Sequence, residues 1–140
     1  MIDHLQDKYI IYIYMILIIG STLLLFIFFI SGINKALNFN STVTGFKNMF
    51  FLKKLPNIFY TLVIVGVIIL EIVAPIIILL EFLNFAKLRM YSYYSSIGLA
   101  IFTILATLIY HPPTNPKERI SFMKNTSIIG GLILLSTFFQ

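Results

Sequence analysis

The chain has 140 residues, of which 59% are hydrophobic and only 11% are charged, and its mean hydropathy is +0.98. Soluble domains are about 45–50% apolar and about 25% charged, so this composition excludes a soluble cytosolic enzyme and favours a membrane protein. The formal net charge is +5, but the basic residues lie mainly between long apolar runs, where they act as topology signals and headgroup contacts. We therefore expect a lipid bilayer as the surroundings and no nucleic acid as a partner.

The sequence contains no cysteine. Disulfide exchange, thiolate metal sites, iron–sulfur clusters and covalent c-type haem all require sulfur ligands, so these functions are excluded. The two histidines lie at opposite ends of the predicted fold, and the sequence therefore predicts no metal site. We expect one membrane domain over residues 1–140, of the all-α class, built as a bundle of four membrane-spanning helices.

The first apolar run covers residues 9–33 and contains no charged residue. About 20 apolar residues cross a hydrocarbon core of ~30 Å, so the run is long enough for one spanning helix. It is too long for the core of a signal peptide and lacks a small-residue cleavage site, so we expect it to remain. One stripe of this helix combines small and large side chains and predicts a closely packed face: Ser21, Leu25, Phe28, Gly32 and Lys35.

The connection that follows, residues 34–57, is long for a helical hairpin and mixes apolar and basic side chains. Val43 and Phe46, for example, stand near Lys47 and Lys53. Such a pattern is typical of an amphipathic helix that lies in the membrane interface with its apolar side toward the acyl chains. We predict an interfacial segment here.

The second run, residues 58–80, is interrupted only by Glu71 and Pro75. Glu71 falls near the bilayer centre, where an ionised carboxylate costs several kcal/mol unless it is protonated, paired or faces a polar cavity. Glu71 is therefore a candidate ligand-binding residue, and the alternative is a neutral, hydrogen-bonded Glu71 that holds two helices together. Pro75 leaves the carbonyl of Glu71 without its helical partner and predicts a bend in this helix.

The third run, residues 91–110, stops at His111, because two prolines follow and cannot continue a helix. His111 is a candidate ligand-binding residue or a polar cap at the end of the helix. A fourth run covers residues 123–139. Small and hydroxyl side chains recur every three or four residues along the third run and predict a face for helix packing: Ser92, Ser96, Ala100, Thr103 and Thr107.

The basic residues are unevenly divided between the two sides of the predicted bundle. The connections 34–57 and 111–122, with the first turn of the fourth run, carry most of them, including Lys35, Lys47 and Lys117. The positive-inside rule then predicts that these connections are cytoplasmic and that both termini lie outside. Lys35 either reaches into the bundle toward Glu71 or extends to the headgroups.

Four segments together resemble one protein family. They are the stretch from Phe29 to Leu37 with the amphipathic segment after it, the pair Leu70-Glu71, the helix end from Ala106 to Pro112, and a fourth helix that opens at Met123 and contains Gly130-Gly131. In this order and spacing they resemble DoxX-like proteins, which are small four-helix membrane proteins. The resemblance extends over nearly the whole chain.

The resemblance implies a membrane subunit of a redox system, and it adds weight to Lys35, Glu71 and His111 as a polar set facing a pocket for a quinone or lipid. None of the side chains cycles electrons, so any cofactor would be a bound quinone or belong to a partner protein. We expect an accessory or anchor subunit that is not an enzyme on its own and associates with protein partners or with further copies of itself.

A second hypothesis is a non-catalytic structural membrane protein of an organelle or of a viral internal membrane or envelope. Isoleucine outnumbers leucine, Asn, Lys, Phe and Tyr are plentiful, and alanine is scarce, as expected of an AT-rich genome such as those of many large DNA viruses and some bacteria. This bias concerns origin rather than activity, so both hypotheses stay open at this point.

Overall fold

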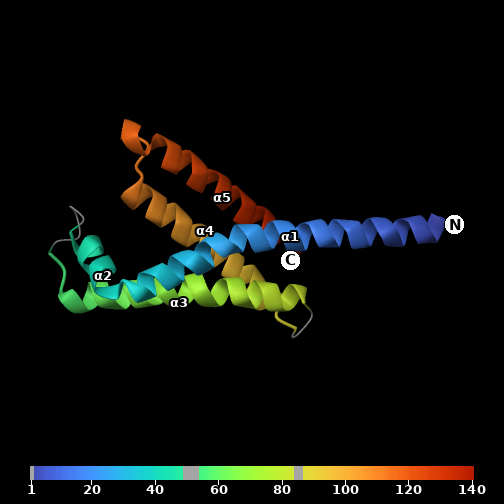
Figure 1. Ribbon diagram of the computed structural model, residues 1–140, viewed down its shortest axis with the longest axis horizontal. Helices are drawn as coiled ribbons and strands as arrows, with labels where there is room; N and C mark the ends of the chain where they lie inside the picture. The colour runs from blue at the N-terminus through green and yellow to red at the C-terminus, as the bar shows by residue number, and fades with distance from the viewer. Residues whose placement is uncertain (1, 49–53, 84–86) are drawn as a thin grey trace.

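A computed structural model describes residues 2–48, 54–83 and 87–140 of the chain (Figure 1). Four of its helices are long and apolar enough to cross a membrane, which confirms the all-α class and a multi-pass membrane protein. In chain order the elements are α1 (Ile2–Leu37), α2 (Phe39–Lys47), α3 (Asn57–Phe82), α4 (Arg89–Tyr110), the short 3-10 helix η1 (Pro116–Glu118) and α5 (Arg119–Phe138).

The helices are longer than the apolar runs that predicted them. An apolar run marks only the part of a helix that suits hydrocarbon, whereas backbone hydrogen bonding continues through polar residues, as α1 does from Ile2 to Leu37. The last of the four membrane-length helices, α5, begins at Arg119 because η1 leads directly into it. Asn115 caps the start of η1, because its side chain accepts a hydrogen bond from the backbone N–H of Lys117 at 3.1 Å. The predicted stop of α4 before His111 is confirmed.

α1 and α3 pack side by side but are displaced along their axes. Gly32, near the end of α1, lies beside Glu71 in the middle of α3, where an added Cβ would be 3.0 Å from Glu71 Cβ. At the C-terminal end of α3, the Tyr14 hydroxyl donates a hydrogen bond of 2.9 Å to the carbonyl of Phe82. The N-terminal part of α1 therefore extends beyond α3, as Figure 1 shows, and the start of α3 extends past the end of α1.

α2 packs against the part of α3 that α1 does not reach. Phe46 meets Tyr60 edge to face, with ring centroids 6.1 Å apart and an interplanar angle of 81°. Tyr60 is fully buried and its hydroxyl accepts a hydrogen bond from the backbone N–H of Leu55. The predicted amphipathic segment thus contains a helix, and its apolar side contacts α3. Its position in the membrane interface stays a prediction. Part of that segment, residues 49–53, lies outside the described residues.

The core occupies the end of the bundle that holds the C-terminus. Leu25, Leu99 and Leu132, from α1, α4 and α5, are each no more than 1% exposed. Arg89 donates hydrogen bonds to the carbonyls of Phe138 and Gln140, so the end of α5 lies beside the start of α4. The predicted packing stripe of α1 is confirmed, since four of its members are buried: Ser21, Leu25, Phe28 and Gly32.

The hydroxyl-bearing stripe of α4 is also buried, as its residue pattern predicted. The hydroxyls of Thr103 and Thr107 donate to carbonyls of their own helix, at 2.7 and 2.6 Å. Ser92 makes the cross-helix contact of this stripe, to the carbonyl of Ile77 in α3 at 3.5 Å. The stripe therefore brings helices together mainly because its side chains are small, and less through hydrogen bonds between helices.

Candidate functional site: a buried ion pair beside a cavity

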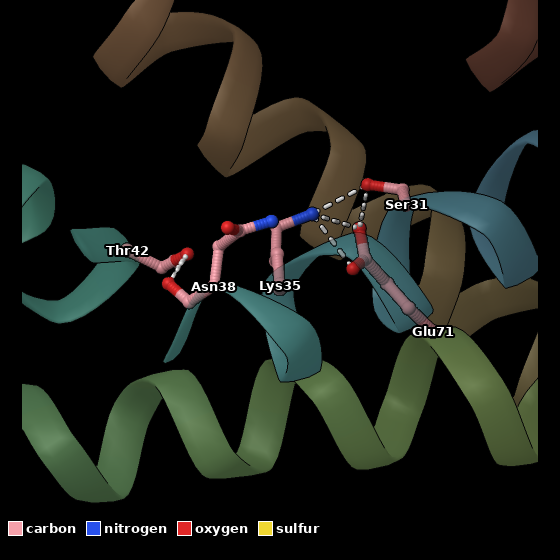
Figure 2. Close-up of polar contacts among 5 residues, drawn as sticks. All are labelled: Ser31, Lys35, Asn38, Thr42 and Glu71. Atoms are coloured by element: carbon pink, nitrogen blue, oxygen red, sulfur yellow. Dashed lines mark hydrogen bonds and ion pairs between the residues drawn. The ribbon is translucent and has the colours of Figure 1, made fainter. Parts of the chain in front are cut away.

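Lys35 and Glu71 form an ion pair between α1 and α3 (Figure 2). The Lys35 Nζ lies 2.7 Å from Oε2 and 2.9 Å from Oε1 of Glu71. Ser31 joins the pair, because its hydroxyl donates to Glu71 Oε1 at 3.2 Å and accepts a hydrogen bond from the Lys35 ammonium. Both carboxylate oxygens are thus bonded by groups of α1.

Three local features bring these groups together. Ser31 and Lys35 are four residues apart and so lie on the same face of α1. Gly32 lies between them in sequence and has no side chain, which lets the α1 backbone approach Glu71. The axial displacement of α1 places the end of that helix, rather than its middle, beside Glu71. The contact between Lys35 and Glu71 follows from this displacement.

The pair is unequally buried. The Glu71 side chain is 3% exposed and that of Lys35 is 26% exposed. Transfer of a lone carboxylate into an apolar environment is expensive, and an adjacent ammonium with a hydroxyl offsets that cost by neutralising the charge and satisfying the oxygens. Among the described residues, every fully buried side-chain nitrogen or oxygen has a hydrogen-bond partner. Glu71 is therefore accommodated in the interior as the negative half of an ion pair whose net charge is zero.

A cavity of about 480 Å³ lies beside this pair. Pockets for small molecules commonly measure about 300–1,000 Å³ and are mainly apolar with a few polar groups, and this cavity agrees with that description. Eight lining residues carry a polar group: Ser31, Lys35, Thr42, Glu71, Thr103, Tyr110, His111 and Asn125. The remaining lining is aliphatic or aromatic and comes from five helices: Ile27, Phe28, Phe46, Val63, Ile64, Val67, Phe102, Leu105, Ala106, Ile109 and Ile128.

His111 lines the same cavity but bonds to a different carboxylate. Its Nδ1 lies 2.6 Å from Oε2 of Glu118, which belongs to η1. Both side chains are about one-third exposed, at 35% and 32%. A direct contact joins Lys35 to Glu71, while His111 shares only the cavity with them.

Two polar partners at this site, Ser31 and Glu118, were absent from the predicted set. Ser31 could have been found from its spacing of four residues to Lys35 on one helix face. Glu118 follows a proline-rich turn whose direction no periodic pattern indicates. Pro75 is buried within the continuous helix α3, and the bend expected there stays a prediction.

In the described part of the chain, no three side chains of His, Asp and Glu lie close enough together to hold a metal ion. The carboxylate of Glu71 instead contacts the Lys35 ammonium, and that of Glu118 contacts the His111 imidazole. Lys35 and Ser31 already donate all their side-chain hydrogens within the pair, so an organic molecule with a polar group would bind here by taking one of these donors from Glu71.

Comparisons of the chain with protein-family models, with curated proteins and with solved structures found no match.

Proposed function

We propose that this protein is a DoxX-like membrane accessory or anchor subunit that holds a small hydrophobic ligand, a quinone as the first candidate, in the cavity beside Glu71. The observation that carries the proposal is the Lys35–Glu71 pair at the wall of a mainly apolar cavity. The two residues belong to separate segments of the resemblance to DoxX-like proteins. Four helices of suitable length and hydropathy provide the membrane anchor.

In this proposal the apolar lining contacts the body of the ligand, and its polar oxygen lies near Lys35 and Ser31. An ammonium and a hydroxyl are donors suited to a quinone carbonyl, and the carbonyl would take over one of the hydrogen bonds that these groups make to Glu71 in the ligand-free pair. No side chain of this chain cycles electrons at ordinary potentials, so a redox partner protein would supply or accept them. The chain would then contribute binding and orientation, with its partner or a further copy of itself completing the assembly.

The test is purification in lipid nanodiscs, followed by extraction and mass spectrometry of the molecules that co-purify. Three proteins are compared: the wild type, Glu71→Gln, and Glu81→Gln as the matched control. Glu81 undergoes the same chemical change but lies outside the cavity, where its carboxylate accepts from the Leu88 N–H. We expect one quinone or one lipid species to be retained by the wild type and the control and lost from Glu71→Gln. Equal, nonspecific lipid in all three would overturn the proposal.

A structural membrane protein is the second candidate, and one observation favours it. Lys35 contacts both oxygens of Glu71, so the pair is complete without a ligand and fastens α1 to α3. Cross-linking in native membranes distinguishes the two candidates. A structural component would be abundant and would cross-link to coat or scaffold proteins, whereas an accessory subunit would cross-link to a redox enzyme.

A further inference from the structure

The bundle is packed at one end and hollow at the other. At the packed end α1 and α5 touch, because a Cβ added to Gly131 would lie 3.2 Å from Cδ2 of Leu24. Towards η1 the two helices diverge, as Figure 1 shows, and the cavity lies in this half. Its α1 wall contains Ile27 and Phe28, and its α5 wall contains Asn125 and Ile128.

Apolar side chains form part of the cavity edge and reach the surface of the bundle, while polar lining residues such as Lys35 and His111 are exposed at another part of it. Ile27 lines the cavity and is nevertheless 51% exposed, and Leu105 on α4 also lines it and is 55% exposed. Ile27 belongs to the charge-free run of α1, and its neighbour Phe26 is 60% exposed. Large apolar side chains exposed on a membrane-spanning helix face acyl chains, so these edges border the bilayer rather than water.

We propose that the cavity is open sideways to the bilayer, with Ile27 and Leu105 at its edges, and that an acyl chain of a surrounding phospholipid occupies it. A cleft that nothing fills leaves its wall atoms without contact partners on one side, and an acyl chain supplies those contacts. The inference rests on the cavity of the proposed function and gives the route by which a lipid-soluble ligand would reach Glu71: it displaces a chain instead of crossing an aqueous opening.

The chain contains no tryptophan, so one introduced tryptophan is a clean fluorescent reporter. The cavity reporter is Phe102→Trp, since Phe102 lines the cavity and an aromatic side chain replaces another. The variant is reconstituted in dioleoylphosphatidylcholine vesicles and in vesicles of phosphatidylcholine brominated at acyl carbons 9 and 10. Bromine quenches tryptophan only on close contact. Phe26→Trp reports full exposure to lipid, and Phe82→Trp, at a site 3% exposed, reports the packed core.

We expect brominated lipid to quench the cavity reporter at least half as strongly as the Phe26→Trp reporter, and much more strongly than the Phe82→Trp reporter. Quenching of the cavity reporter by aqueous acrylamide but not by brominated lipid would overturn the proposal, because the cavity would then be a water-filled vestibule. Quenching by neither agent would also overturn it, because the cavity would then be closed.

A second reporter, Ile128→Trp on the α5 wall, keeps the test decisive if Phe102→Trp does not fold, as judged by circular dichroism and gel filtration. The measurement needs no knowledge of the native ligand. The two tests can fail separately. If the mass-spectrometric test finds no ligand that depends on Glu71, quenching of the cavity reporter by brominated lipid would still support the lateral opening. Conversely, an unquenched reporter would remove the lateral route while a specific ligand could still depend on Glu71.

Discussion

Lys35, in the last turn of α1, reaches Glu71 in the middle of α3, with Nζ 2.7 Å from Oε2. A helix end and a helix middle meet because α1 and α3 are displaced along their axes. α2 then covers the part of α3 that α1 leaves free, and the cavity lies between this unit and the α4–α5 hairpin. The pair is therefore linked both to the packing of α1 on α3 and to the cavity wall.

Lys35→Met should destabilise the protein by about 3 kcal/mol, because Glu71 would lose its counter-charge while remaining buried. Unfolding by a denaturing detergent in mixed micelles measures the change. The double variant Lys35→Met with Glu71→Leu should recover much of the loss, since it removes both charges. A double variant that is less stable than Lys35→Met would show that the two residues do not act as a pair.

Gly32→Ala should cost about 1–3 kcal/mol, because the new methyl group would lie 2.8 Å from Cγ1 of Ile72 and force α1 away from α3. Gly20→Ala is the control on the same helix, with no atom within 4 Å of the added Cβ. The control should be neutral or more stable, since alanine favours helix over glycine. Equal effects in the same unfolding assay would contradict the close approach of the two helices.

His111→Gln should change stability by less than about 1 kcal/mol, because the side chains of its hydrogen-bonded pair with Glu118 are each about one-third exposed. Thermal unfolding of His111→Gln and Glu118→Gln, measured by circular dichroism, tests this expectation. A similar small change in both variants agrees with a solvent-exposed hydrogen bond between the two side chains. A loss as large as that of Lys35→Met would instead mean that η1 is an essential support of the bundle.

The orientation predicted from the basic residues can be tested with single cysteines, because the natural chain contains none. Thr114→Cys lies in the connection expected in the cytoplasm, and Gln140→Cys lies at the C-terminus, which is expected outside. A membrane-impermeant maleimide applied to intact cells should label Gln140→Cys, and should label Thr114→Cys only after lysis. The reverse pattern would show that the bundle is inserted the other way round.

The sequence alone determined that four helices are long and apolar enough to cross a membrane, and approximately where each lies. That information is local, because it resides in runs of apolar residues long enough for a bilayer and in helix-stopping residues such as the two prolines after His111. The buried faces of α1 and α4 were predictable for the same reason, since small residues at helical spacing mark them. Glu71 stood out because a carboxylate is rare in such a run.

Only the tertiary structure decided which polar groups meet. The pairing of Lys35 with Glu71 depends on how far α1 is displaced along α3, and this displacement arises from the packing of Gly32 on α3 and of α2 on the remaining part of α3. His111 bonds to Glu118 rather than to Lys35 or Glu71 because a short 3-10 turn brings Glu118 back to it. Apolar periodicity defines which face of a helix is buried, but it does not define the axial position of one helix against another.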